Sequence, residues 1–274
     1  MAENKRWTDV IRARKSVRTF DGRDLSPAHR AALERAMAEA PRLLTIPVRF
    51  QWLDAEADKL SSPVIVGART YLAGKVKRQP LAAAAYGYSF EHLLLSAAAL
   101  GLGTVWIAGT LDRPAFEAAV ALQADEVMPA ASPVGYAAKR SIRERAMRKA
   151  VKADTRLPFE RLFFAGDFAA PLTPETAGNW ADPLEMVRLA PSAVNKQPWR
   201  VVTDGQRVHF YECRSRGISK GDVLDIQQVD LGIALCHFEL AAREAALSGH
   251  FAAADPGIAC PDHTTYVLTY EADA

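Results

Sequence analysis

Two short segments of the chain carry residue types that bind phosphate or other polar ligands. The first, Arg14-Lys15-Ser16-Val17-Arg18-Thr19-Phe20, places three cations and a hydroxyl within five positions. If this segment is extended, Arg14, Ser16 and Arg18 point the same way, because side chains alternate along a strand. Guanidinium forks and a hydroxyl suit the oxygens of a phosphate monoester. The segment is a candidate phosphate clamp, with a solvated basic turn as the alternative.

The second segment is Ala190-Pro191-Ser192-Ala193-Val194-Asn195-Lys196-Gln197-Pro198-Trp199, which we expect to connect a helix to a strand. Its prolines and small residues let the backbone approach a ligand, while its polar side chains offer amide and hydroxyl groups. Trp199 is expected to anchor the turn to a core. An ordinary helix-to-strand connection is the alternative, since such connections are common.

Composition narrows the class of protein. The 274 residues are 49% hydrophobic with a net charge of +2, which permits a large core and favours neither nucleic acid nor a membrane surface as partner. The start lacks an apolar signal core, which favours a cytoplasmic location. The apolar run 81–102 contains Glu91 and His92, so a buried helix is expected there. The histidines, acids and three cysteines show neither a nucleophilic triad nor metal-ligand spacing.

The spacing of hydrophobic residues and the residues that start and stop helices predict a mixed α/β organisation. Helices are expected over 7–14, 26–40, 81–100 and 229–249, after Asp112 and in the basic run 139–149, and strands around 48–52, 63–66, 104–107 and 133–136. Ser26-Pro27 supplies a cap followed by proline at the first helical position. The basic run is expected to be mostly a solvated face from Arg143 to Lys149.

The second half of the chain repeats features of the first in the same order. Leu25-Ser26-Pro27 is matched by Leu172-Thr173-Pro174, and Ala40-Pro41 by Ala190-Pro191. These echoes predict two repeats, 1–160 and 161–274, packed as one compact unit. In the second copy, Arg161, Leu162, Phe163 and Ala165 stand where the first has Arg14, Lys15, Ser16 and Arg18. The basic segment and the polar turn therefore each survive in only one copy.

Both segments resemble signatures of the nitroreductase family of FMN-dependent oxidoreductases. The first is similar to its R-x-S-x-R-x-F opening motif and the second to its APSAxNxQPW motif, with weaker similarity at Gly101–Gly109 and at Val134-Gly135-Tyr136, where Ala137 replaces a usual proline. The resemblance implies an α+β nitroreductase-like fold with mixed, mostly antiparallel sheets flanked by helices. It also implies that two tandem half-repeats form an intramolecular pseudo-dimer.

The resemblance also implies one FMN site per chain between the repeats. The cofactor-binding residues that it implies are Arg14, Lys15, Ser16, Arg18, Lys139 and Arg140 at the phosphate, Ile107, Ala108 and Gly109 along the flavin ring, and Pro191, Ser192, Ala193 and Asn195 from the second half. No catalytic side chain is implied, because flavin N5 carries the chemistry and the backbone of Ala108 and Gly109 supports it.

The implied activity is hydride transfer from NAD(P)H to FMN and then to a nitroaromatic, a quinone or a similar small molecule. Two alternatives stay open: an FMN-binding carrier or sensor without turnover, and a flavin-free structural or regulatory α/β protein. A monomer is expected because the family's dimer would be fused in one chain.

Overall fold

The structure is a computed structural model that describes residues 5–214 and 225–273. The chain forms two compact units. One consists of residues 13–153, and the other combines residues 1–12 with 154–274. We name them the 13–153 unit and the 154–274 unit, and describe each by itself. The boundary predicted at residue 160 concerns the duplication and stays a prediction.

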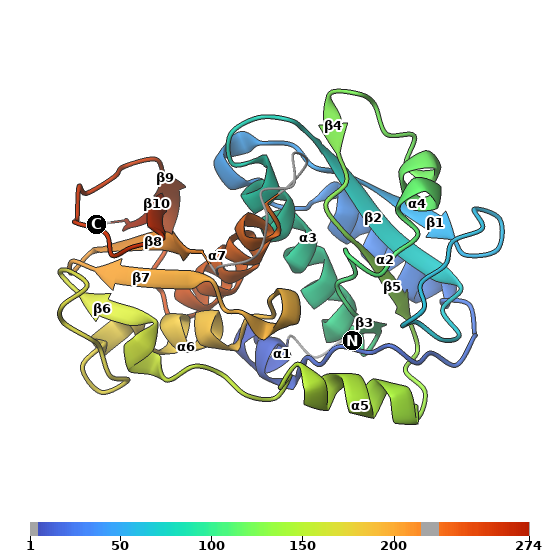
Figure 1. Ribbon diagram of the computed structural model, residues 1–274, viewed down its shortest axis with the longest axis horizontal. Helices are drawn as coiled ribbons and strands as arrows, with labels where there is room; N and C mark the ends of the chain where they lie inside the picture. Colours follow the sequence, from blue (N-terminus) through green and yellow to red (C-terminus); the bar gives the residue numbers. More distant parts are fainter. Residues whose placement is uncertain (1–4, 215–224, 274) are drawn as a thin grey trace. The chain divides into compact units, whose positions relative to one another are not determined.

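The 13–153 unit contains a five-stranded antiparallel sheet with strand order β1-β2-β5-β3, in which β4 also pairs with β2. Its elements are α2 (Pro27–Ala38), η1 (Leu43–Thr45), β1 (Arg49–Asp54), β2 (Thr70–Lys77), α3 (Ala82–Ala99), β3 (Gly103–Thr104), α4 (Arg113–Ala119), β4 (Glu126–Val127), β5 (Ala131–Gly135) and α5 (Ile142–Ala150). Figure 1 shows α2 and α3 beside this sheet.

Helices cover both faces of this sheet. Tyr71 of β2 packs edge-on against Phe116 of α4, with ring centroids 5.2 Å apart. On the opposite face, Phe50 of β1 stacks on Phe90 of α3 at 5.6 Å. The helix α3 is buried along most of its length, as its apolar composition predicts. Ser26 caps α2 by accepting a hydrogen bond from the His29 amide, which confirms the predicted start of that helix.

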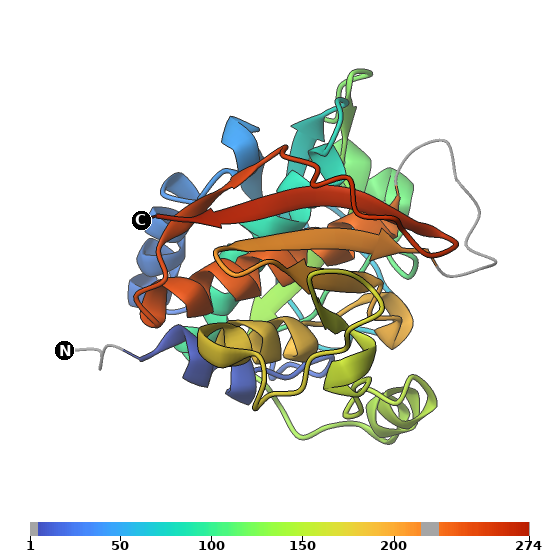
Figure 2. The same cartoon turned by 90° about the vertical axis from the view of Figure 1, so that its left-hand side faces the viewer.

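The 154–274 unit contains a second five-stranded sheet, of order β6-β7-β8-β10-β9, in which only β6 and β7 are parallel. Its elements are α1 (Trp7–Ala13), η2 (Phe159–Arg161), β6 (Phe163–Ala165), η3 (Gly178–Trp180), α6 (Ala181–Leu189), η4 (Ala193–Asn195), β7 (Trp199–Thr203), β8 (Arg207–Cys213), α7 (Ile226–Glu244), β9 (Gly249–Ala252) and β10 (Thr264–Ala272). Figure 2 shows the long strands β8 and β10 side by side above α7.

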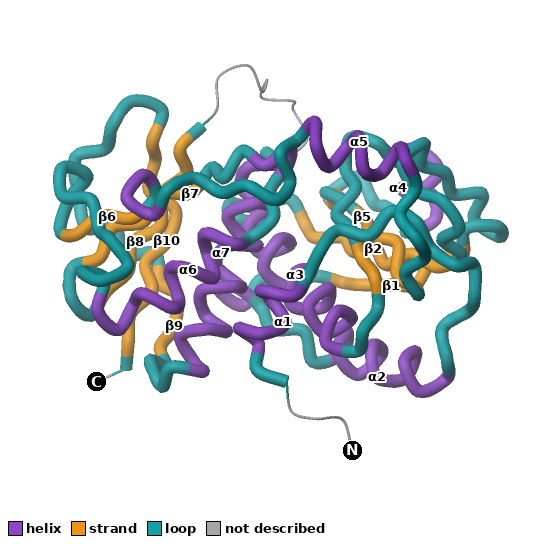
Figure 3. Tube along the Cα trace, turned by 90° about the horizontal axis from the view of Figure 1, so that it is seen from below, coloured by secondary structure: helices purple, strands orange, loops and turns teal. Residues whose placement is uncertain are grey.

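The core of this unit lies between its sheet and α7. Phe238 of α7 packs against Phe210 of β8 and Tyr270 of β10, with ring centroids 5.1 Å and 5.0 Å apart. Helix α6 lies alongside α7 (Figure 3). The Glu244 carboxylate at the end of α7 accepts hydrogen bonds from the Thr8 amide and hydroxyl at 3.1 Å and 2.9 Å. The first helix thereby belongs with the C-terminal part of the chain.

The two units share an order of elements. Each has a helix, a one-turn 3₁₀ segment, two antiparallel strands and a long buried helix, and the strand orders β1-β2-β5-β3 and β7-β8-β10-β9 correspond. The 3₁₀ segments even share an unusual backbone conformation, with Leu44 at φ 45° and ψ 40° and Val194 at φ 44° and ψ 30°. This shared order supports the proposed duplication.

One predicted strand is wrong. Residues 63–66 were expected to form a short buried strand, but they form a turn followed by a single bridge between Val66 and Thr19, and Val66 is 53% exposed. The partner of β1 is instead β2, which sequence patterning missed because it contains Gly74 and two lysines. Glycine is required there, since a Cβ on Gly74 would lie 2.6 Å from the Phe50 ring.

No helix within residues 5–214 and 225–273 has both the length and the apolar character that a membrane span requires.

Candidate anion and cofactor site

The basic segment runs along the edge of the first sheet, where Ser16 forms a bridge with Thr104 of β3. The Val17 amide donates to the Thr104 carbonyl at 2.9 Å, and the Phe20 amide donates to the Val66 carbonyl at 2.8 Å. Gly103 permits this close approach, because a Cβ there would lie 2.8 Å from the Val17 side chain. With Val17 packed on Gly103 and Phe20 buried, the chain is fixed on both sides of Arg18.

Helix α5 is attached to this segment through Thr19. The Ser141 hydroxyl caps α5 by accepting from the Glu144 amide at 3.1 Å. The Thr19 hydroxyl donates to the Glu144 carboxylate at 2.8 Å and accepts a long 3.5 Å contact from the Ser141 amide. Thr19 therefore bridges a capping box of the type S-x-x-E. This contact fixes the start of α5 against the basic segment.

Three arginines gather where α5 meets the basic segment. Arg148 follows Glu144 by one helical turn, so it lies on the same face of α5, and it is 8% exposed. Burial lowers the pKa of Arg14, Glu91 opposes that shift, and the nearby charge of Arg148 adds to it. Burial also lowers the pKa of Arg18, Glu144 opposes it, and Arg148 again adds to it. Three cations thus share one partly desolvated region with two carboxylates.

The guanidinium groups of Arg14 and Arg18 have no hydrogen-bond partner among the residues that the structure describes. Among the residues that the structure describes, neither side chain makes a hydrogen bond or an ion pair within 4.0 Å, and Arg14 Nε is buried. A buried donor without an acceptor is costly. The half-buried hydroxyl of Ser16 lies on the same strand face. A phosphate monoester fits this group, because it would supply acceptor oxygens and negative charge together.

The other predicted phosphate-binding cations are more exposed. Lys15, Lys139 and Arg140 all lie at the surface, and Arg140 Nε lies 3.5 Å from the Glu144 carboxylate. Their role in phosphate binding stays a prediction. Arg148, by contrast, was expected to belong to a solvated face and is buried beside Arg14 and Arg18. The structure does not describe the side chain of Arg143.

The predicted ring-binding loop follows strand β3. Ile107 is fixed to β5 by two hydrogen bonds with Ala131, both 2.9 Å long. The Ala108 carbonyl accepts from Arg113 Nη2 at 3.2 Å, and the same guanidinium donates to the carbonyls of Met128 and Pro129. Within residues 5–214 and 225–273, no group accepts a hydrogen bond from the Ala108 or Gly109 amide. Gly109 is exposed, so its amide is available to a ligand.

A buried glutamate connects this loop with the basic segment. Glu91 of α3 is fully buried and accepts a hydrogen bond of 2.6 Å from the Trp106 indole. The same carboxylate is the charge that opposes the lowered pKa of Arg14. Trp106 directly precedes the ring-binding loop, and its ring packs edge-on against Phe90 at 4.9 Å. The Glu91 carboxylate therefore interacts both with Arg14 of the basic segment and with Trp106, next to the predicted ring-binding loop.

The polar turn of the 154–274 unit is built on a buried acid. Both carboxylate oxygens of Asp230, on α7, accept from the Ala193 amide at 3.0 Å and 3.1 Å. Burial raises the pKa of Asp230 well above its ordinary value, although the Ala193 amide opposes the shift. The Ser192 hydroxyl accepts from the Gln197 amide at 2.9 Å, which closes the turn. Ser192 and Ala193 are thus supports of the turn.

The Asn195 side chain is also used inside the 154–274 unit. Its amide nitrogen donates to the Thr155 carbonyl at 3.1 Å, and its oxygen lies 3.5 Å from Arg156 Nη1. Pro191 is half-buried. Whether Pro191, Ser192, Ala193 and Asn195 serve the same flavin as the arginine cluster stays a prediction.

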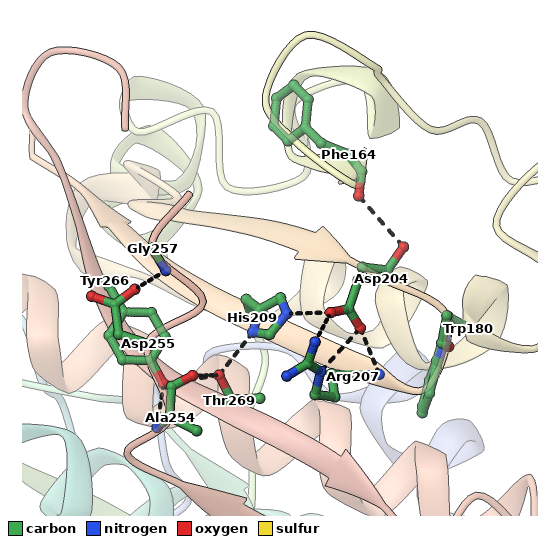
Figure 4. Close-up of polar contacts among 12 residues, drawn as sticks. Phe164, Trp180, Asp204, Arg207, His209, Ala254, Asp255, Gly257, Tyr266 and Thr269 are labelled. Carbon is green, nitrogen blue, oxygen red and sulfur yellow. Dashed lines mark hydrogen bonds and ion pairs between the residues drawn. The ribbon is translucent and has the colours of Figure 1, made fainter. Parts of the chain in front are cut away.

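A second polar cluster, on β8 and β10, has a structural role (Figure 4). His209 lies between Asp204, at 3.3 Å, and the Thr269 hydroxyl, at 2.8 Å, an order that resembles a nucleophilic triad. Both His209 and Thr269 are fully buried, and the Thr269 hydroxyl also contacts the Ala254 carbonyl at 2.8 Å. A hydroxyl that no substrate can reach is no nucleophile, so the cluster fastens the 252–257 segment to the sheet.

Two residues of the site were missed by sequence reasoning. Arg148 is four positions after Glu144, and Glu144 is three positions after Ser141, so a capping box followed by an i, i+4 pair marked this helix face. Arg113 was missed because its carbonyl partners come from two other segments of the chain, one that holds Ala108 and one that holds the adjacent Met128 and Pro129.

The chain is similar to several solved structures. A putative nitroreductase from Thermotoga maritima is 22% identical, with a TM-score of 0.65 over 99% of this chain and 95% of that one. An FMN-dependent nitroreductase from Clostridium difficile (13% identity, TM-score 0.42) matches 48% of this chain and 88% of its own. Iodotyrosine deiodinase bound to FMN and 3-iodo-L-tyrosine (18% identity, TM-score 0.42) matches 49% of this chain and 91% of its own.

No curated protein matches the chain. Residues 7–242 match the family described as "Putative TM nitroreductase", which confirms both the family resemblance and the nitroreductase-like α+β fold with two mostly antiparallel sheets. The chain therefore belongs to the putative TM nitroreductase family.

Proposed function

We propose that this protein is an FMN-dependent oxidoreductase that takes hydride from NAD(P)H and reduces a nitroaromatic, a quinone or a similar small acceptor. Family membership supports flavin-based redox chemistry. The observation that carries the proposal is the cluster of Arg14, Arg18 and Arg148, in which two guanidinium groups lack partners among the described residues.

In this proposal the chain binds and orients the cofactor. Arg14, Ser16, Arg18 and Arg148 hold the FMN phosphate, and the Ala108 and Gly109 amides donate toward the edge of the flavin ring. When bound, FMN supplies N5 as the atom that accepts hydride. The exposed cations Lys15, Lys139 and Arg140 contribute to the positive potential that attracts the phosphate. A cytoplasmic location and a monomeric state belong to the same proposal.

A titration followed by rapid mixing tests the proposal. Purified protein is titrated with FMN to obtain the stoichiometry, for which we expect one FMN per chain, and is then mixed anaerobically with NADH or NADPH in a stopped-flow spectrometer. Bleaching of the flavin absorbance, with recovery upon addition of a quinone or a nitroaromatic, is the expected result. If FMN binds but neither nucleotide bleaches it, the protein is a flavin carrier and the proposed reductase activity is wrong. Failure to bind FMN would overturn both.

A further inference from the structure

We infer that Arg113 is a positioning residue that aims the Gly109 amide at flavin N5. The inference rests on the proposed function, because it assigns a role at the same flavin site. Arg113 lies at the start of α4, outside every motif that resembles the family's signatures. Its guanidinium joins three carbonyls: Ala108 at 3.2 Å, Met128 at 2.9 Å and Pro129 at 3.3 Å.

The geometry of the peptide bond carries the argument. A trans peptide is planar, and its carbonyl and amide hydrogen point in opposite directions. Arg113 holds the Ala108 carbonyl on the protein side, so the Gly109 N–H of the same peptide unit must point away from Arg113. Ile107 fixes the other end of the loop through its two bonds to Ala131. The peptide between Ala108 and Gly109 is therefore held against rotation.

The surroundings of Gly109 fit a ligand-facing donor. Gly109 is exposed, and a Cβ built on it would meet no atom within 4 Å. No acceptor for its amide exists in the part of the chain that the structure describes. Without Arg113 the Ala108 carbonyl would lose its fixed partner, and the peptide could turn its oxygen toward the ligand. A carbonyl oxygen there would repel the lone pair of oxidised N5.

The test compares FMN with 5-deaza-FMN, in which a carbon replaces N5 and cannot accept a hydrogen bond. Both flavins carry the same phosphate, so the ratio of their dissociation constants isolates the contact at this position. In the wild-type protein we expect FMN to bind about threefold to tenfold more tightly, the range of one neutral hydrogen bond. In Arg113→Ala this preference should fall to about one, while the preference for FMN over riboflavin, which reports the phosphate contacts, stays unchanged.

Arg113→Lys provides a second variant that keeps the positive charge but lacks a fork able to hold several carbonyls at once. Arg113→Lys should keep less than half of the free-energy difference between the binding of FMN and of 5-deaza-FMN. It also keeps the inference testable if the alanine variant misfolds. Arg145→Ala, at an exposed position on α5, is the matched control and should keep the full preference. A wild-type ratio near one, or an unchanged ratio in both Arg113 variants, would overturn the inference. If no flavin binds, the proposed function fails as well.

Discussion

Thr19 and Glu144 are joined by a 2.8 Å hydrogen bond that fastens α5 to the basic segment. Glu144 is 3% exposed, so its carboxylate depends on this donor. The bond explains how Arg148, one turn further along α5, comes to lie beside Arg14 and Arg18. The candidate anion site of the 13–153 unit therefore depends on the attachment of α5 as well as on the motif that carries its first two arginines.

Replacing Thr19 by valine tests this attachment. The variant removes a hydrogen bond to a buried carboxylate, so we expect the free energy of unfolding to fall by about 1.5–3 kcal/mol. Urea denaturation followed by circular dichroism measures the loss. Thr110→Val, at an exposed position, is the control and should change little. Equal stability of the two variants would show that Thr19 does not hold α5.

Arg148→Ala tests the third arginine of the cluster. We expect the dissociation constant for FMN to rise about tenfold or more, the effect of a charged hydrogen bond, while riboflavin binding stays the same because it lacks the phosphate. Isothermal titration calorimetry measures both ligands. Arg145→Ala, on the exposed face of the same helix, should leave both constants unchanged. Equal losses for FMN and riboflavin would argue against a phosphate contact.

Asp230 should make stability depend on pH. Its folded-state pKa is raised by burial, so the folded protein binds a proton that the unfolded chain releases. The stability that proton binding by Asp230 contributes is complete when the pH is below the unfolded pKa of about 3.9. It is lost as the pH rises through the pKa of the folded protein. Asp230→Asn keeps an acceptor for the Ala193 amide and removes the titration. Its free energy of unfolding should therefore increase relative to the wild type as the pH rises.

Thermal unfolding between acidic and neutral pH measures this difference, with Asp262→Asn, at an exposed position, as the control. A difference between wild type and Asp230→Asn that stays constant with pH would contradict the assignment.

Val194 carries backbone strain that asparagine should relieve. A β-branched residue is disfavoured at φ 44°, whereas asparagine tolerates the left-handed region. Because Val194 is 63% exposed, little buried area is lost. We expect Val194→Asn to raise the free energy of unfolding by about 1 kcal/mol. Val66→Asn is the control, since Val66 is 53% exposed without a positive φ, and it should not be stabilising. Destabilisation by Val194→Asn would indicate that valine makes a contact that the turn needs.

The sequence predicted the parts of the fold and site that depend on local patterns. The cap at Ser26 followed from its side chain and the proline after it, and the buried α3 followed from its apolar run. The strand β2 was missed because it contains Gly74. A glycine is needed there because the ring of Phe50, which is distant in the sequence, packs against its backbone. Arg148 was missed because its burial depends on a hydroxyl, that of Thr19, lying far from it in the chain.

The turn of residues 190–199 shows the same limit. Its composition indicated a polar connection near a ligand, but its support by Asp230 comes from a helix that begins well after it in the sequence. Val194 in a left-handed conformation contradicts its local preference, so only the surrounding structure explains it. Spacing therefore indicated residues of the candidate site but not the contacts that hold them.

The binding of FMN and riboflavin to Arg18→Ala tests the central claim most directly. Arg18 makes no hydrogen bond or ion pair within 4.0 Å with the described side chains, so a phosphate contact should be its main role. We predict that FMN binding weakens by about 1.5–3 kcal/mol in this variant while riboflavin binding is unchanged. FMN binding that is unaffected by the substitution, or riboflavin that binds the wild-type protein as tightly as FMN, would contradict the assignment of this cluster as the flavin phosphate site.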